Sequence, residues 1–271
     1  MNWDECERLE VIGVDEIALK KGHRDFVTIV TARSSEQGEI RLLAVLEDRK
    51  KDTVKAFFSS IPKRLRKTVR VVCTDLYDGF VNAAREVFGR RVRIVADRFH
   101  VAKLSREGLE RLRKREMKRL KKELPEESYR ELKGVMWLLR KDEKTLTEEE
   151  RKVLKRLFAY SPMLALAYIF CCVLTEIFDR DLSVGQAKLT LAAWKQLVEE
   201  SELECFDGFL STLEERMDEI ANYFAGRHNS GFVEGLNNRI KVIKRRCYGI
   251  LNIGHLFQRI HLDLAGYSLF A

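Results

Sequence analysis

The composition of this 271-residue chain is that of a globular protein, because 45% of its residues are hydrophobic, which is enough to bury a sizeable core and excludes a disordered chain. Lysine and arginine outnumber aspartate and glutamate by 50 to 42, and the resulting net charge of +8 favours a polyanionic partner, either nucleic acid or an acidic membrane. The six cysteines include no C-x-x-C pair, so they indicate neither a zinc ribbon nor a disulfide framework and fit a reducing cytosol.

The first part of the chain predicts three antiparallel strands. An apolar run at 11–14 stops abruptly at Asp15 and Glu16, which indicates a strand that carries carboxylates at its tip. Two further β-rich runs, at 26–31 and 40–46, are separated by a polar segment with the glycine expected of a hairpin connection.

The next elements alternate between helices and strands. They are a helix at 52–58, a continuous apolar strand at 69–73, a helix at 77–88 and an alternating strand at 91–96. The strand at 69–73 leads directly to Asp75, and the strand at 91–96 leads to Asp97. Three strands of this region are therefore expected to end in an acid.

From about residue 103 to 223 the composition changes to leucine, glutamate, lysine and arginine, and we expect an all-helical region without strands. The longest apolar run, at 163–174, is shorter than the roughly 20 residues that a membrane-spanning helix needs, so we expect a cytoplasmic protein with no membrane partner. A polar helix is predicted over 230–246, and it carries Glu234.

One short stretch of the helical region is strongly basic. Between Lys103 and Lys122 ten basic residues meet three acidic ones. This excess of positive charge could bind the phosphates of duplex DNA. It is equally typical of the solvated face of a helix whose other face carries an apolar stripe of leucines.

Acids at the ends of separate strands are costly to gather unless cations neutralise them. In a sheet of order 3-2-1-4-5 the strands that precede Asp15 and Asp75 are neighbours, and Glu234 would reach them from a helix laid across the sheet. Two hard cations, Mg²⁺ or Mn²⁺, would then activate a water or a 3′-hydroxyl for an in-line phosphodiester displacement. For each acid alone the alternative is a cap on the next helix, and for Asp97 a cap, a ligand or a supporting carboxylate all stay open.

The predicted helix around Glu234 places amides and cations on the face of the acid. The residues at i+3, i+4, i+7 and i+11 are Asn237, Asn238, Lys241 and Arg245. Such a face suits a phosphate backbone, with Lys244 as a further candidate. Among the aromatic residues, Trp137 and Trp194 are candidates for base stacking or, more simply, for the core.

Several segments form a pattern that is more specific than any one of them. They are Val-Asp-Glu at 14–16, Lys-Lys-Gly-His at 20–23, Thr-Asp at 74–75, Ala-Asp-Arg-Phe-His-Val at 96–101, and the run from Asn-Ser-Gly-Phe-Val-Glu to Lys-Arg-Arg-Cys-Tyr-Gly at 229–249. Together they resemble the ISL-type (ISL-three) insertion-sequence transposases of the DDE superfamily, over roughly positions 11 to 267.

The resemblance implies an α/β, RNase H-like fold, with a mixed five-stranded sheet of order 3-2-1-4-5 and a large helical insertion before the last catalytic helix. Its catalytic and metal-binding acids fall on Asp15, Asp75 and Glu234. The spacing of the last two agrees, because 234 minus 75 is 159 residues, far too long for a plain crossover. We therefore expect three segments: the first part of the core at 1–102, the insertion at 103–223, and the rest of the core at 224–271.

The implied function is metal-dependent DNA strand cleavage and strand transfer in DNA transposition, by a homodimer or higher oligomer on DNA ends. The alternatives are an RNase H-like nuclease without strand transfer and a non-catalytic DNA-binding remnant. The resemblance also implies that full-length family members have a zinc-binding segment and a helix-turn-helix ahead of the catalytic domain. This chain, in contrast, begins almost at the first strand. We therefore expect DNA binding through phosphates with little sequence preference; the roles of Asp97 and His100 stay open.

Overall fold

The protein is described by a computed structural model at residues 3–20, 24–34, 40–228, 231–247 and 252–266. The chain divides into two compact units. The first, here called the sheet unit, comprises Met1–Asp97 and Ala225–Ala271, and the second, the helical unit, comprises Arg98–Phe224. The sequence placed the corresponding boundaries after residues 102 and 223.

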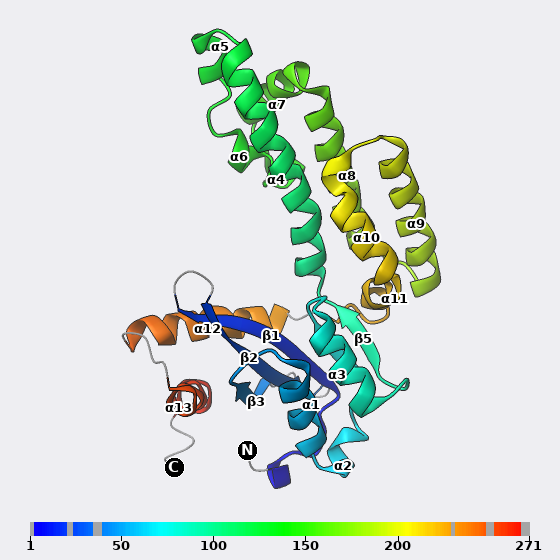
Figure 1. Ribbon diagram of the computed structural model, residues 1–271, viewed down its shortest axis with the longest axis vertical. Coiled ribbons are helices and arrows are strands. Elements are labelled where there is room, and N and C mark those ends of the chain that lie inside the picture. Colours follow the sequence, from blue (N-terminus) through cyan, green and yellow to red (C-terminus); the bar gives the residue numbers. More distant parts are fainter. Residues whose placement is uncertain (1–2, 21–23, 35–39, 229–230, 248–251, 267–271) are drawn as a thin grey trace. The chain divides into compact units, whose positions relative to one another are not determined.

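The sheet unit is built on one mixed sheet of five strands. The strands are β1 (Val11–Lys20), β2 (Arg24–Arg33), β3 (Ile40–Leu46), β4 (Val71–Thr74) and β5 (Arg93–Ala96). Their order is β3-β2-β1-β4-β5, with β1, β2 and β3 antiparallel and with β4 and β5 parallel to β1 (Figure 1). This sheet is the one that the sequence predicts, and the RNase H-like α/β fold class is confirmed.

Helices cover both faces of the sheet. One face packs against α1 (Lys51–Ser60) and α3 (Asp78–Phe88), with the short α2 (Lys63–Arg66) following α1. The other face packs against α12 (Gly231–Arg246) and α13 (Ile253–Ala265) (Figure 1). The sheet unit therefore has three layers, and its last two helices come from the far end of the sequence.

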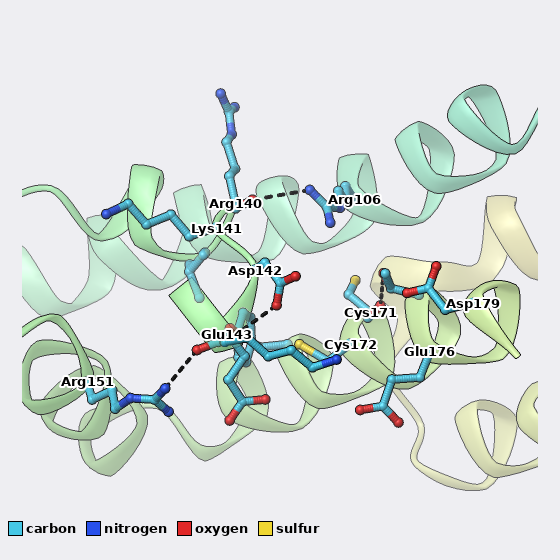
Figure 2. Close-up of a pocket in the computed structure, with 14 residues that line it drawn as sticks. Arg106, Arg140, Lys141, Asp142, Glu143, Arg151, Cys171, Cys172, Glu176 and Asp179 are labelled. Carbon is cyan, nitrogen blue, oxygen red and sulfur yellow. Dashed lines mark hydrogen bonds between the residues drawn. The ribbon is translucent and has the colours of Figure 1, made fainter. Parts of the chain in front are cut away.

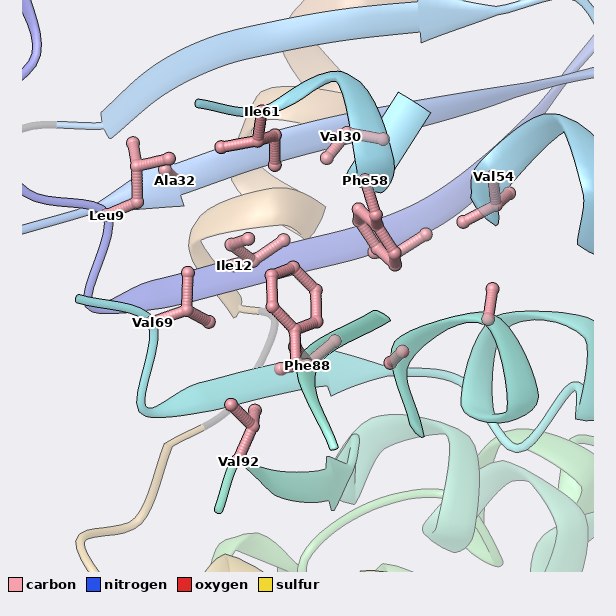
Figure 3. Close-up of a cluster of buried hydrophobic side chains, with 14 of the residues drawn as sticks. Leu9, Ile12, Val30, Ala32, Val54, Phe58, Ile61, Val69, Phe88 and Val92 are labelled. Carbon is pink, nitrogen blue, oxygen red and sulfur yellow. The ribbon is translucent and has the colours of Figure 1, made fainter. Parts of the chain in front are cut away.

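The alternation of side chains along β1 explains why both faces hold a core. Ile12 points into the cluster that contains Phe58 of α1 and Phe88 of α3 (Figure 3). Val14 belongs to the same cluster. Ile17 lies three residues after Val14, so it points to the opposite face and belongs to the cluster beneath α12 and α13. A strand buried on both faces reads as a nearly continuous apolar run, as the first part of β1 does at 11–14.

The first strand is longer than the sequence predicts. The prediction of a strand at 11–14 with Asp15 at its tip is wrong, because β1 continues to Lys20 in a hairpin with β2. The parallel pairing between β1 and β4 does end near Asp15, because its last residue pair is Val14 with Thr74. Asp15 therefore lies inside a strand, immediately after the end of one of its two ladders.

The helical unit is described at every residue and contains no strand between 98 and 224. Its α-helices are α4 (Arg98–Glu123), α5 (Glu126–Arg130), α6 (Val135–Leu138), α7 (Glu148–Tyr160), α8 (Pro162–Asp179), α9 (Val184–Glu200), α10 (Asp207–Glu215) and α11 (Met217–Ala221). Trp194 lies in its core, 2% exposed, and donates its indole N–H to the carbonyl of Phe170 at 3.1 Å.

Helix α8 is 18 residues long and contains the 12-residue apolar run at 163–174. By length and composition alone it would be long enough to cross a membrane, and 44% of it is buried inside the protein. Its buried side contacts α4, α7 and α9. This arrangement is that of a core helix in a helical bundle.

Candidate active site

Three aspartates of the sheet unit follow one another across neighbouring strands. The last paired residues of the parallel ladders are Val14 on β1, Thr74 on β4 and Ala96 on β5. The next residue on each strand is an aspartate: Asp15, Asp75 and Asp97. The backbone N–H of Asp97 donates to the carbonyl of Thr74 at 2.9 Å and extends the ladder by one residue. The three residues thus occupy one row across three adjacent strands.

The face of the sheet to which Asp15 belongs is the one that α12 covers. Asp15 lies directly opposite Ile29 of β2, and cross-strand partners share a face. Ile29 packs in the same apolar cluster as Ile240 and Ile243 of α12. Helix α12 also carries Glu234, whose side chain lies outside the described residues, so its predicted approach to the two aspartates stays a prediction.

The two aspartates make local hydrogen bonds that hold the backbone around them. Asp15 is buried, and its Oδ1 accepts the N–H of Glu16 at 2.7 Å. Asp75 is half-buried, and its Oδ1 accepts the N–H of Tyr77 at 3.0 Å, two residues ahead. Tyr77 is the N-cap of α3 and supplies no side-chain cap. Asp75 therefore shapes the turn before α3 and is not itself the N-cap residue.

Asp97 is the most deeply placed of the three, with 3% of its surface exposed. Burial and, to a smaller extent, the charge of Asp97 together raise the pKa of the neighbouring Cys73 thiol to about 12. In the metal-free protein Cys73 is therefore a neutral thiol. The three aspartates of the row offer oxygen donors.

The remaining acid of the Val-Asp-Glu motif is already engaged. Glu16 forms an ion pair with Arg49, whose Nη1 lies 3.1 Å from Oε2 of Glu16. The Arg49 guanidinium also lies over the rings of Phe26 and Tyr77, 5.2 and 5.0 Å from their centroids. Sequence reasoning did not identify Arg49, since it lies 33 residues from Glu16 and follows no motif.

The carboxylate oxygens of these aspartates are the type of ligand that a hard divalent cation such as Mg²⁺ or Mn²⁺ prefers. Among the side chains that the structure describes, no three from histidine, cysteine, aspartate and glutamate are close enough together to hold a metal ion. The predicted set of three includes Glu234, which is not among them. Of the predicted set, the structure describes the side chains of Asp15 and Asp75.

The helix that carries Glu234 presents polar and basic side chains to solvent further along. Asn238, Lys241 and Arg245 are exposed, and Nε of Arg245 donates to the carbonyl of Lys241 at 3.3 Å. The side chains of Asn237 and Lys244 lie outside the described residues. The exposed positions are available for contact with a large polyanion.

Trp137, a candidate from the sequence, and the histidine His228 have different surroundings. Trp137 is 62% exposed and lies beneath the guanidinium of Arg140, at 5.6 Å from its ring centroid. Burial lowers the pKa of His228, and the charges of Arg93 and Arg33 lower it further, so this imidazole is neutral at pH 7. A neutral histidine adds no positive charge to the sheet unit.

A cavity of about 500 Å³ in the helical unit lies between the segment around Asp142 and helix α8 (Figure 2). Its charged lining residues are Arg106, Arg140, Lys141, Lys144, Arg151, Asp142, Glu143, Glu176 and Asp179. Two of its arginines donate to backbone carbonyls within the lining, Arg106 to that of Arg140 and Arg151 to that of Glu143. Five cations against four acids nearly cancel, so this cavity does not select a polyanion.

Comparisons with known proteins match this chain to transposases. The sequence model of the ISL3-type DDE family, described as a transposase, matches residues 12–260. The transposase for insertion sequence element IS1001 of Bordetella parapertussis is 28% identical over 262 residues, which cover 96% of this chain. The transposase for insertion sequence element IS1557 of Mycobacterium tuberculosis is 23% identical over 283 aligned positions, covering 97% of this chain. The chain spans 62% of the length of these relatives.

Proposed function

Since this chain belongs to the ISL-three family of DDE transposases, we propose that it catalyses metal-dependent cleavage and transfer of DNA strands in the transposition of an insertion sequence. The observation that carries the proposal is the placement of Asp15 and Asp75 side by side on β1 and β4, on a sheet whose covering helix α12 bears Glu234. The proposed segments are the core at 1–102 and 224–271 and the helical insertion at 103–223.

In this mechanism the three acids have one shared role. Asp15, Asp75 and Glu234 would hold Mg²⁺ or Mn²⁺, which would supply Lewis-acid activation of the attacking and leaving oxygens when bound. The neighbouring strands fix the spacing of the two aspartates, because each follows the last residue of a common ladder. The rigid backbone therefore positions the carboxylates before DNA binds, which lowers the reorganisation needed in the transition state.

The same helix supplies contacts to the substrate. Asn237, Asn238, Lys241, Lys244 and Arg245 are the residues that we assign to the DNA backbone beside the reacting phosphate. Contacts of this kind fix the register of the duplex and do not read its sequence. The partner is DNA, bound in the cytoplasm by a homodimer or higher oligomer on DNA ends.

The test is metal-dependent nicking and joining of DNA by the purified chain. A supercoiled plasmid is incubated with Mg²⁺ or Mn²⁺, and open-circular and strand-joined products are separated on a gel. We expect D15N, D75N and E234Q to lower the rate at least about 10³-fold, a loss typical of removing an essential catalytic group. The matched control is E16Q, whose carboxylate is paired with Arg49 and should keep the rate within about threefold.

The outcomes separate the competing functions. Nicking without any joined product would identify a nuclease that lacks strand transfer. Binding of DNA without any metal-dependent cleavage would identify a non-catalytic remnant and would contradict the proposal. Equal activity in E16Q and D75N would show that the assigned carboxylates are not the catalytic ones.

A further inference from the structure

Helix α4 presents an unusual concentration of positive charge on one side. Six of its cations are Arg111, Lys114, Arg115, Lys118, Lys121 and Lys122. At 3.6 residues per turn these positions fall within about one third of the circumference of the helix. All six side chains are exposed. We call them the α4 ridge.

The acids of the same helix pair with only one member of the ridge, since Oε1 of Glu110 lies 3.7 Å from Nζ of Lys114. Their shorter contacts are with Arg113 and Arg119, which lie outside the ridge. Glu110 makes a two-pronged contact with Arg113, with Nη2 2.7 Å from Oε1, and the pKa of Glu110 is lowered chiefly by this arginine. Glu116 and Glu123 both pair with Arg119. Two arginines on the flank of the helix thus occupy three of its acids.

Several ridge cations are left without a carboxylate partner. Within the helical unit, every residue of which the structure describes, Arg115, Lys118, Lys121 and Lys122 form no ion pair. Arg111 donates from Nη2 to the carbonyl of Cys205 at 3.1 Å, which anchors the first end of the ridge. The middle of the ridge borders an open hollow of about 290 Å³, lined by Arg115, Lys118, Arg119, Lys122 and Glu123.

The dimensions of the ridge suit the backbone of a nucleic acid. From Arg111 to Lys122 the helix rises about 16 Å at 1.5 Å per residue. Phosphates of one DNA strand advance by about 3.4 Å along the duplex axis, so a ridge of this length spans about five of them. Six cations along such a length match the charge density of one strand.

The apolar side of α4 argues against an acidic membrane as the occupant. Leu109, Leu112 and Leu120 are buried in the helical unit. A helix that binds a lipid surface needs an apolar face free to enter the bilayer, and here that face is already covered. The ridge offers charge alone, which is what sequence-independent binding to phosphates requires.

We propose that the α4 ridge is a second DNA-binding surface, carried by the helical unit, that grips the backbone of duplex DNA. The proposal rests on the proposed function for its choice of DNA, and it adds a role for the helical unit. The ridge contributes affinity and no chemistry, because it contains no carboxylate able to hold a metal.

The experiment compares two triple variants of the full chain. The ridge variant carries Arg115→Glu, Lys118→Glu and Lys122→Glu. The control carries Lys133→Glu, Lys144→Glu and Lys155→Glu, three exposed lysines elsewhere in the helical unit, so the net charge changes by the same amount. Circular dichroism and the unfolding temperature of each variant verify that the unit is folded.

Binding is measured by fluorescence anisotropy on a 30-base-pair duplex of arbitrary sequence, across a salt series. We expect the ridge variant to lose at least tenfold in affinity at 0.1 M salt, and its slope of log K against log salt to fall by about 2.7, for three lost contacts at about 0.9 each. The control should lose less than threefold. Equal losses in the two variants would show that only net charge matters and would overturn the proposal.

Two further measurements separate this proposal from the proposed function. Cleavage by the unaltered chain is the first. If the ridge variant alone weakens binding while no protein cleaves DNA, the ridge stands and the proposed catalysis fails. If the unaltered chain cleaves DNA and the ridge variant binds normally, the ridge proposal fails alone. Loss of binding to phosphatidylserine vesicles without loss of binding to DNA would assign the ridge to lipid and overturn the proposal.

Discussion

Val14 of β1 lies opposite Thr74 of β4 as the last pair of their parallel ladder. The residue after each is an aspartate, so the fold places two carboxylates on adjacent strands at the same level of the sheet. Like charges so placed repel each other unless a cation lies between them. Such a pair is suited to holding a metal.

Divalent metal should therefore stabilise the chain through these two residues. We expect Mn²⁺ at about 100 times its dissociation constant to add about 2.7 kcal/mol to the free energy of unfolding, which corresponds to a rise of roughly 5–10 °C in the unfolding temperature. D15N and D75N should lose most of this rise, whereas E16Q should keep it. Differential scanning fluorimetry with and without Mn²⁺ measures the effect, and an equal rise in all four proteins would contradict the assignment.

The docking of α12 on the sheet should control activity through Glu234. Ile240 is fully buried against the sheet, so Ile240→Ala should lower the free energy of unfolding by about 2–5 kcal/mol and reduce cleavage even well below the unfolding temperature. Val242, 40% exposed on the same helix, is the matched control, and Val242→Ala should change stability by less than about 0.5 kcal/mol. Urea denaturation and the plasmid assay test this prediction. Normal cleavage by the Ile240→Ala protein would show that activity does not depend on the packing of α12 against the sheet.

Gly108 of α4 marks the closest approach of that helix to the short η3 (Glu204–Phe206). A Cβ at Gly108 would collide with the carbonyl oxygen of Cys205 and touch the ring of Phe206. Gly108→Ala should therefore cost about 1–3 kcal/mol, although alanine favours helix. Gly185 of α9 has open space around it, so Gly185→Ala should raise stability by up to about 1 kcal/mol. Thermal unfolding compares the two, and a stabilised Gly108→Ala protein would contradict this packing.

Glu116 should make the stability of the helical unit depend on pH. Burial alone would raise the pKa of this carboxyl, but hydrogen bonds from Arg119 and Ser161 outweigh burial and lower the pKa below its ordinary value of 4.5. A lowered pKa contributes stability above pH 4.5 that is lost as the pH falls through the folded value. Glu116→Gln should therefore cost about 1–3 kcal/mol at pH 7, and the difference should shrink below pH 4.5. Denaturation curves at pH 7 and pH 3.5 test it; a difference that grows in acid would contradict the sign.

The sheet order was predicted from the resemblance to the ISL-type family, whereas the strands that lead to the acids were predicted from local patterns. Apolar runs of strand length lead directly to Asp75 and Asp97, and those patterns survive in the structure at β4 and β5. The length of β1 was not predicted, because Glu16 and Lys20 interrupt the apolar run. The strand continues there through its pairing with β2, which is a tertiary interaction that no local pattern records.

The row of three aspartates was likewise beyond local reasoning. Asp97 joins Asp15 and Asp75 through the register of β5 on β4, and register follows from which residues pair across strands. Arg49 was missed for a similar reason, since its partner Glu16 is distant in sequence and its position over Tyr77 depends on the turn after β4. The sequence therefore predicted residue types but did not determine the contacts between distant segments.

The most direct test of the account is the position of Mn²⁺ in a crystal of this chain, located by its anomalous scattering. We predict one or two peaks, about 4 Å apart if two, with carboxylate oxygens of Asp15, Asp75 and Glu234 at about 2.0–2.6 Å. A crystal of D75N should lose at least one of them. Peaks bound elsewhere, or bound to Asp15 and Asp75 with Glu234 directed away from them, would contradict the assignment of Glu234 as the third acid.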